Sequence, residues 1–154
     1  MIKTLYFRCP VGFVKVCGEN DYLTEIKLTD FAEENSSEIS EEMKKCQLQI
    51  EEYFEGKRKD FDLNLRFEGT EFRKKVWQAL LNVPYGKTAS YKDIAVMVES
   101  PKAVRAVGGA NHNNPFWIVV PCHRIIGSDG SLTGYGGGLD KKKFLLELEK
   151  TICK

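Results

Sequence analysis

The hydrophobic pattern of this chain changes its period from about two residues to about three and a half, and this change constrains the fold more than any other feature. Short runs of β-branched and aromatic residues occupy positions 5–7, 13–17 and 22–28. Turn-forming stretches at 10–12 and 18–21 separate them. Short runs bounded by turn residues are typical of strands. The pattern therefore predicts an antiparallel meander of three strands.

A helical pattern follows the predicted meander. The stretch 40–43 resembles a capping box, and Gly56 is a stop signal. Apolar residues between them recur over about three turns and would cover one face of the sheet. These residues are Met43, Leu48, Ile50, Tyr53 and Phe54. Alternating apolar residues at 61–67 predict one more strand, with a domain boundary near Glu68-Gly69.

The second part of the chain is predicted to be more helical. Thr70 can cap a helix with one buried stripe. The stripe consists of Phe72, Val76, Trp77, Leu80 and Leu81. The stretch 90–93 is a second capping signature, and Pro101 suits the first position of a third helix that continues to Ala110. Two short helices joined by a tight turn indicate a helix-turn-helix.

The third predicted helix has features of a helix that reads DNA. Lys102 and Arg105 are three residues apart and would share one helical face. Ala106 and Gly108 are small enough to let the backbone approach a groove. The alternative is that these small residues only let two helices pack closely. Glycine within a helix costs about 1 kcal/mol relative to alanine, which favours a functional reason.

Charge differs between the two parts of the chain. Residues 1–67 hold 10 Lys/Arg and 14 Asp/Glu, whereas residues 68–154 hold 13 and 8. A basic part joined to an acidic one is expected of a polyanion-binding domain with a separate partner domain. The chain has no apolar segment long enough to span a bilayer and no secretory signal, which predicts a cytosolic or nuclear location.

The cysteines are expected to be free thiols. The five are odd in number and irregularly spaced, and no two form a Cys-x-x-Cys pair. This pattern suggests neither a disulfide framework nor a zinc site. We expect no cofactor and no metal.

One thiol stands beside one of the two histidines of the chain. The apolar run 116–120 predicts a buried strand or packed turn, and Pro121 ends its hydrogen bonding just before Cys122. Neighbouring side chains on a strand point to opposite faces, so His123 can act on Cys122 only through a bend or a bridging water. A base that removes the thiol proton would make Cys122 a nucleophile.

The last predicted helix offers a carboxylate that could orient that base. Asp140 is expected to cap it, and its buried stripe would be formed by Phe144, Leu145, Leu148 and Ile152. Glu149 shares this buried side, whereas Glu147 points more toward solvent. A buried carboxylate needs a partner, and His123 is the obvious candidate. The alternative is an inert, packed Cys122 with an unrelated surface charge at Glu149.

These residues carry a resemblance to a known family. The segment Pro121-Cys122-His123-Arg124-Ile125-Ile126, with Asn114-Pro115, Ser90-Tyr91 and the stretch 105–110, resembles the O6-alkylguanine-DNA alkyltransferases, which repair DNA by direct reversal. The match covers about residues 68–154 closely. Residues 1–67 resemble the less distinctive N-terminal domain of the family.

The resemblance implies an α/β (α+β) fold in two domains. Residues 1–67 would form a ribonuclease H-like domain with a sheet and a helix. Residues 68–154 would form a mostly helical, winged helix-turn-helix domain that binds DNA and accepts the alkyl group. Some family members bind a structural zinc in the first domain. That domain has no histidine here, so no metal is expected.

The resemblance also assigns roles to residues of the reaction site. Cys122 would be the acceptor that keeps the alkyl group as a thioether, so that each molecule reacts once. His123 would be the water-bridged base, Glu149 would orient it, and Asn114 would brace the turn. Tyr91 would crowd the target phosphate and donate a hydrogen bond to the flipped base.

Further positions are assigned to DNA and to the guanine pocket. Arg105 would fill the gap in the duplex, next to other DNA-binding residues. These are Tyr91, Lys102, Ala106, Gly108 and Ser128. The guanine pocket would be formed by Tyr135, Gly136 and Ile125. Gly136 stands where some members have serine, which could alter the tolerance for bulky alkyl groups.

The predicted function is therefore irreversible transfer of an alkyl group from O6-alkylguanine in double-stranded DNA, with O4-alkylthymine as a second candidate substrate. The protein would act as a monomer in the cytoplasm, or in the nucleus of a eukaryote. It would not bind to a membrane. Two alternatives remain. A cysteine hydrolase would use the same three groups but turn over. A non-catalytic lesion-binding protein would need only Tyr91, Arg105 and the pocket.

Overall fold

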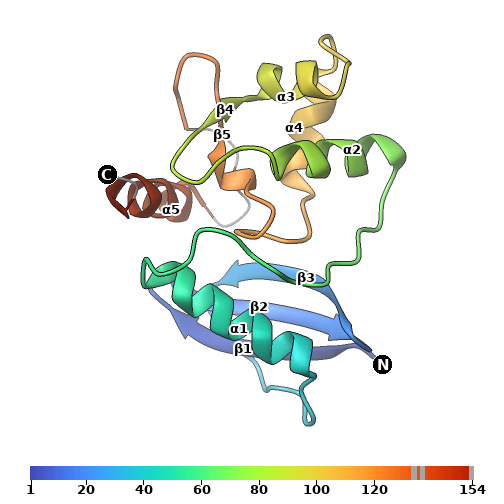
Figure 1. The fold of residues 1–154 in the computed structure, drawn as a ribbon, viewed down its shortest axis with the longest axis vertical. Helices are drawn as coiled ribbons and strands as arrows, with labels where there is room; N and C mark the ends of the chain where they lie inside the picture. The colour runs from blue at the N-terminus through green and yellow to red at the C-terminus, as the bar shows by residue number, and fades with distance from the viewer. Residues whose placement is uncertain (133–134, 136–137, 153–154) are drawn as a thin grey trace. The chain divides into compact units, whose positions relative to one another are not determined.

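The structure is a computed structural model that describes residues 1–132, 135 and 138–152 (Figure 1). The chain forms two compact units, Met1–Phe67 and Glu68–Lys154. The first combines a three-stranded sheet with a helix, and the second is mostly helical. The mixed fold class predicted from the sequence is confirmed.

The sheet of the first unit is the predicted meander. Its strands are β1 (Lys3–Cys9), β2 (Gly12–Glu19) and β3 (Tyr22–Thr29), paired antiparallel in the order β1-β2-β3. Side chains alternate between the faces, so that Val14 and Val16 are fully buried while Lys15 between them is not.

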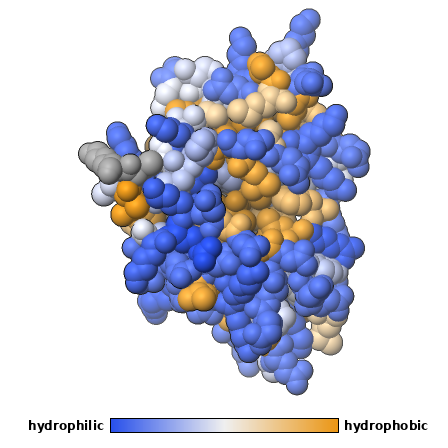
Figure 2. Space-filling model, in the orientation of Figure 1, coloured by the Kyte–Doolittle hydropathy of each residue, from blue (hydrophilic) through white to orange (hydrophobic). Residues whose placement is uncertain are grey.

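Helix α1 (Glu41–Phe54) covers one face of this sheet (Figure 1). Ser40 caps it by accepting a hydrogen bond from the Met43 backbone at 3.2 Å, as the sequence predicts. Its buried residues are Met43, Cys46, Gln49, Ile50 and Tyr53. Leu48 was expected there, but it is 57% exposed because it lies about 200° around the helix axis from Cys46. The surface over α1 is mostly hydrophilic in Figure 2.

The strand predicted at 61–67 does not form. The segment makes a single bridge, between Leu65 and Leu23 of β3. The Gln49 side chain instead forms two hydrogen bonds with the backbone of Asp62. It accepts from the Asp62 N–H at 2.9 Å and donates to the Asp62 carbonyl at 3.0 Å. A side-chain amide therefore satisfies backbone groups that a strand would pair with a neighbouring strand.

The second unit begins with helix α2 (Glu71–Leu80), which Thr70 caps as predicted. Its buried residues are Val76, Trp77, Ala79 and Leu80. The Trp77 indole donates a hydrogen bond of 2.9 Å to the Ala110 carbonyl and so ties α2 to a later helix. Leu81 was expected in the buried stripe, but it lies beyond the last helical residue and is 43% exposed.

The predicted helix-turn-helix consists of α3 (Tyr91–Met97) and α4 (Val104–His112). Ser90 and Asp93 form the expected capping box at the start of α3. The third predicted helix begins later than expected, at Val104. A turn closed by the Ala103 N–H and the Ser100 carbonyl holds Pro101, whose fixed φ suits a turn as well as a first helical position.

The chain returns from α4 through buried turns to a short 3-10 helix, Cys122–Arg124. Residues 116–120 form the packed turn rather than the strand. The strand that follows this 3-10 helix, β5 (Ile125–Ile126), pairs in parallel with β4 (Ala89–Ser90), which directly precedes α3. They hold the residue before α3 beside the segment that follows Cys122.

Helix α5 (Leu139–Ile152) ends the described chain. Asp140 was expected as its cap, but it is the second residue of the helix. Phe144 and Ile152 are 37% and 39% exposed, so they do not belong to the buried stripe. The buried residues are Lys141, Lys142, Leu145 and Glu149. The inward face is thus partly charged, which an apolar pattern does not reveal.

Among the residues that the structure describes, no helix has the length and hydropathy needed to cross a membrane.

Candidate active site

Cys122 is the first residue of the short 3-10 helix. The Cys122 N–H donates to the Val120 carbonyl at 2.7 Å, and the Arg124 N–H donates to the Pro121 carbonyl at 3.0 Å. The chain therefore bends at Pro121, which is one of the two conditions set by the sequence for His123 to act on Cys122. The thiol lies inside the unit, with Cys122 only 3% exposed.

Asn114 holds the turns that precede Cys122. Its Nδ2 donates to the carbonyls of Val120 at 2.8 Å and Phe116 at 3.3 Å, and its Oδ1 accepts from the Phe116 N–H at 2.9 Å. These turns contain Ile118 at φ 72°. A β-branched residue in the left-handed region is strained and persists only when its surroundings fix it. The Asn114 amide provides part of that constraint.

His123 and Glu149 form the pair predicted from the sequence. His123 Nε2 lies 2.6 Å from Glu149 Oε2, and both side chains are almost completely buried. The Gly86 N–H donates to the other carboxylate oxygen at 3.2 Å. His123 Nδ1 is buried and makes no hydrogen bond within the described residues. With Nε2 donating to the carboxylate, Nδ1 is the nitrogen that can accept a proton.

Arg124 is a third member of this network, and sequence reasoning missed it. Its guanidinium donates to both oxygens of Glu149, at 2.8 and 3.1 Å, and to the Val83 carbonyl at 2.7 Å. It also lies over the Tyr85 ring, 5.6 Å from the centroid. The only signal was its place in the Pro-Cys-His-Arg segment, because an arginine is usually expected at the surface.

The pKa values of the groups in this network are shifted in different directions. Burial raises the pKa of Cys122 to about 11, against hydrogen bonding by Asn114 and the charge of Lys142. Burial also lowers the pKa of His123 below its usual value, which Glu149 only partly offsets. Burial opposes ionisation of Glu149, but His123 and Arg124 outweigh it and hold the pKa of Glu149 near 2. The resting site therefore has a neutral thiol, a neutral imidazole and an ionised carboxylate.

Lys142 is a second charged residue that the sequence did not point to. Its ammonium group is fully buried and donates to the Ile125 carbonyl, in the strand that follows the 3-10 helix. Burial lowers the pKa of Lys142 to about 8, against a raising effect of Cys122. A lysine is normally expected at the surface, so only the fold shows this one to be internal.

The residues predicted for the guanine pocket are only partly described. Ile125 is fully buried in β5. The Tyr135 ring packs on Trp117 with centroids 5.2 Å apart, and burial raises the pKa of Tyr135 well above the usual value, with the charge of Glu149 adding to this effect. Gly136 lies outside the described residues.

The residues predicted to bind DNA belong mainly to the helix-turn-helix. Tyr91 is the first residue of α3, and a Cβ added to Gly108 would lie 3.9 Å from its ring. Arg105 and Ala106 are exposed in the first turn of α4. Lys102 was expected on the same helical face as Arg105, but it lies in the turn before α4. Ser128 is exposed in a separate turn at 127–130.

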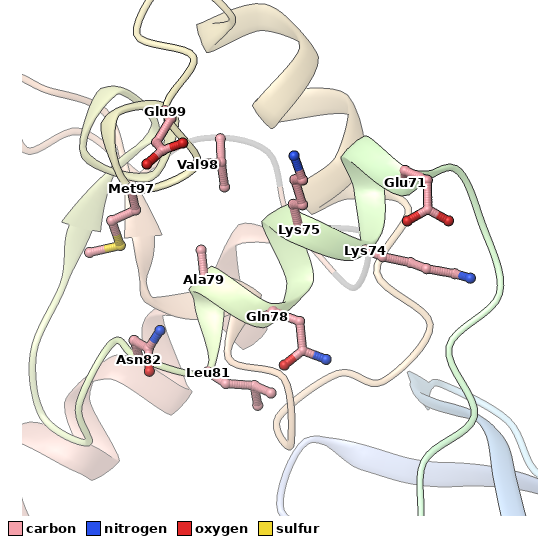
Figure 3. Close-up of a pocket in the computed structure, with 10 residues that line it drawn as sticks. All are labelled: Glu71, Lys74, Lys75, Gln78, Ala79, Leu81, Asn82, Met97, Val98 and Glu99. Carbon is pink, nitrogen blue, oxygen red and sulfur yellow. The ribbon is translucent and has the colours of Figure 1, made fainter.

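A groove of about 920 Å³ lies between α2 and the end of α3 (Figure 3). Lys74, Lys75 and Gln78 of α2 line it together with Met97 and Glu99. It includes none of the residues predicted for the reaction, so this groove is not the candidate site. Within the described residues, no group of three or more His, Cys, Asp or Glu side chains is arranged to hold a metal ion.

Comparisons with known proteins agree on one family. Residues 71–151 match the model described as 6-O-methylguanine DNA methyltransferase, DNA binding domain, and residues 1–67 match the ribonuclease-like domain of the same description. A methylated-DNA–protein-cysteine methyltransferase of Mycolicibacterium paratuberculosis is 45% identical over 154 residues, covering 97% of this chain and 93% of that protein. The protein of the same name from Methanosarcina acetivorans is 46% identical over 148 residues, covering 93% and 95%.

Solved structures give the same answer. The crystal structure of Mycobacterium tuberculosis OGT in complex with DNA superimposes with a TM-score of 0.85 at 40% identity, covering 96% of this chain and 92% of that chain. The crystal structure of the M. tuberculosis O6-methylguanine methyltransferase gives a TM-score of 0.85 at 39% identity, covering 98% and 94%.

Proposed function

This chain belongs to the 6-O-methylguanine DNA methyltransferase family, and we propose that it repairs duplex DNA by moving the alkyl group of O6-alkylguanine onto its own Cys122. The observation that carries the proposal is the buried pair of His123 and Glu149 beside that cysteine, 2.6 Å apart. We infer that one molecule, acting as a cytoplasmic monomer, repairs one lesion.

The chemistry begins with the proton of the thiol. A neutral imidazole whose Nε2 donates to Glu149 has Nδ1 free to accept this proton through a bridging water. The sulfur then attacks the alkyl carbon, and the bond from that carbon to O6 breaks. The proton held by His123 then passes to the released guanine, which would otherwise leave with a negative charge. Glu149 stabilises the transient imidazolium.

The other predicted residues fit supporting roles in this reaction. Asn114 fixes the turn that carries Cys122. Tyr91 begins α3, where its hydroxyl can donate to an extruded guanine. Extruding a nucleotide costs a few kcal/mol, and Arg105 would offset this by filling the vacated stack. Lys102, Ala106, Gly108 and Ser128 would contact the backbone of the DNA and add little sequence preference.

Mass spectrometry of the intact protein tests the proposal. Mixed with a duplex that contains O6-methylguanine, the protein should gain one methyl group, and peptide mapping should place it on Cys122. Cys122→Ser should gain none while binding DNA with similar affinity. Cys9→Ser, which changes a half-buried thiol of the other unit, should behave like the unaltered protein.

The outcomes separate the alternatives. Repair of more than one DNA molecule per protein molecule, with no methyl group found on the protein, would indicate a hydrolase instead. Tight binding with neither labelling nor repair would indicate a lesion-binding protein. A methyl group mapped to a cysteine other than Cys122 would overturn the assignment of the acceptor.

A further inference from the structure

One carboxylate oxygen in the interior of the second unit is shared by a histidine and an arginine. Glu149 Oε2 lies 2.6 Å from His123 Nε2 and 3.1 Å from Arg124 Nη2. Arg124 also donates through Nε to the other oxygen of Glu149, at 2.8 Å. All three residues are at most 6% exposed. The histidine and the arginine therefore interact with the same buried negative charge.

The guanidinium group of Arg124 is also held by contacts that do not involve Glu149. Its Nη1 donates to the Val83 carbonyl at 2.7 Å, and the group lies over the Tyr85 ring, 5.6 Å from the centroid. Arginine does not lose its proton in proteins, because its pKa lies above the range in which proteins are folded. These contacts therefore fix a permanent positive charge beside the carboxylate.

The charges of this cluster balance only while His123 is neutral. Arg124 carries one positive charge and Glu149 carries one negative charge. A proton on His123 would add a second positive charge to a buried cluster with one carboxylate, and an uncompensated buried charge is costly. Burial lowers the pKa of His123 against the effect of Glu149, and the charges of Arg124 and Lys142 lower it further.

The other ionisable groups near His123 do not change this balance at neutral pH. The thiol of Cys122, the preceding residue, is neutral because burial raises its pKa to about 11. The Tyr135 hydroxyl is neutral because burial raises its pKa well above the usual value, and the charge of Glu149 adds to this effect. The protonation of His123 therefore depends mainly on Glu149, Arg124 and Lys142.

We propose that Arg124 is a positioning residue whose charge, shared with Glu149, keeps His123 unprotonated at neutral pH, so that Nδ1 can accept the thiol proton of Cys122. The inference rests on the proposed function and adds to it the control of the pH at which the site works. Without the charge of Arg124, Glu149 and His123 would form a buried ion pair with no net charge. His123 would then hold its proton in the resting protein, and Nδ1 could not act as a base.

Nuclear magnetic resonance of the histidine rings measures this protonation directly, without DNA and without the reaction. In the unaltered protein at about pH 7, the ring nitrogen shifts of His123 should show a neutral ring with its proton on Nε2. Arg124→Met should raise the titration midpoint of His123 by about 1–3 pH units, because a nearby positive charge is removed. Arg124→Lys keeps a positive charge, so its midpoint should stay within about 0.5 pH unit of the unaltered protein.

The pH dependence of methyl transfer tests the same inference during the reaction. At about pH 6.5, the single-turnover rate constant of Arg124→Met with O6-methylguanine duplex should be about 10- to 100-fold below that of the unaltered protein. The difference should narrow as the pH rises, because His123 then loses its proton. A merely structural role of Arg124 would lower the rate by the same factor at every pH. Arg124→Lys should restore most of the rate at the lower pH.

The chain offers two controls for these measurements. Arg73→Met makes the same substitution at an exposed arginine of α2 and should leave both the His123 midpoint and the shape of the rate profile unchanged. His112 is the other histidine of the chain and is exposed, so its ring signal should follow the same curve in every variant. If Arg124→Met does not fold, Arg124→Gln removes the same charge and retains an N–H donor for Glu149.

The inference and the proposed function fail in different ways. A His123 ring that is protonated at about pH 7 in the unaltered protein would overturn the inference and leave methyl transfer intact. A midpoint that does not move when the charge of Arg124 is removed would also overturn it, as would equal midpoints for Arg124→Met and Arg124→Lys. An unaltered protein that gains no methyl group would overturn the proposed function, whereas the ring signals would still show whether Arg124 keeps His123 neutral.

Discussion

Glu149 and His123 lie 26 positions apart in the sequence, yet their side chains share a buried contact of 2.6 Å. The same carboxylate accepts two hydrogen bonds from Arg124 and one from the Gly86 backbone. Four donor atoms therefore converge on one carboxylate. This arrangement keeps Glu149 ionised and leaves His123 Nδ1 as the nitrogen that can accept a proton, so both the proposed chemistry and the stability of the site depend on it.

Glu149→Gln should slow methyl transfer by about 100-fold, because a neutral amide stabilises the imidazolium poorly. The measurement is the single-turnover rate with O6-methylguanine duplex, together with the affinity for that duplex, which should change little. Glu147→Gln, an exposed carboxylate of the same helix, is the matched control. A rate equal to that of the unaltered protein, in a folded Glu149→Gln variant, would remove Glu149 from the mechanism.

Acid should weaken the folded state through the same carboxylate. The pKa of Glu149 is about 2 in the folded protein and 4.5 when unperturbed, so its ionised form stabilises the fold above pH 4.5. This contribution is of the order of 3 kcal/mol and is lost as the pH falls from 4.5 toward 2. Urea unfolding across this range should show a steeper loss for the unaltered protein than for Glu149→Gln. Parallel curves would show that Glu149 ionisation does not stabilise the fold.

The sequence predicts the local features of this protein better than its charged interior. The Ser90–Asp93 capping box and the Thr70 cap involve residues three apart, so local rules suffice to find them. Leu48 and Leu81 were assigned to buried stripes because they are apolar, whereas contacts far along the chain decide which helix face is covered. The strand predicted at 61–67 failed for a similar reason, since a side chain on α1 satisfies its backbone.

The residues of the candidate site were likewise predicted only in part from the sequence. Cys122, His123 and Glu149 were found because their chemistry is rare and the spacing of α5 places Glu149 inward. Arg124 and Lys142 were not found, because charged residues are normally exposed and only the tertiary structure shows them buried. Trp117 was assigned to the core as one apolar residue among five. Its contact with Tyr135 depends on two segments that the sequence does not relate.

Asn114→Ala should lower the free energy of unfolding by about 2–4 kcal/mol, because three buried hydrogen bonds that link the turns before Cys122 are lost. Asn114→Asp keeps the acceptor for the Phe116 N–H but brings a charged oxygen toward the two carbonyls, so it should destabilise at least as much. Urea denaturation of both variants measures this effect. A loss below 1 kcal/mol in both would show that the turn holds Ile118 in place without Asn114.

Arg105→Ala should separate base extrusion from chemistry. Arg105 is exposed at the start of α4, so its removal leaves the packed site intact. If it fills the gap left by the extruded nucleotide, repair of O6-methylguanine in duplex DNA should slow by about 10- to 100-fold. Reaction with the same base in single strands, where little unstacking is needed, should slow much less.

Lys102→Ala is the control, because it removes a nearby charge outside the helix. It should reduce both reactions to a similar and smaller extent and should weaken their salt dependence. Equal losses of Arg105→Ala on duplex and single strands would mean that this arginine contributes only its charge.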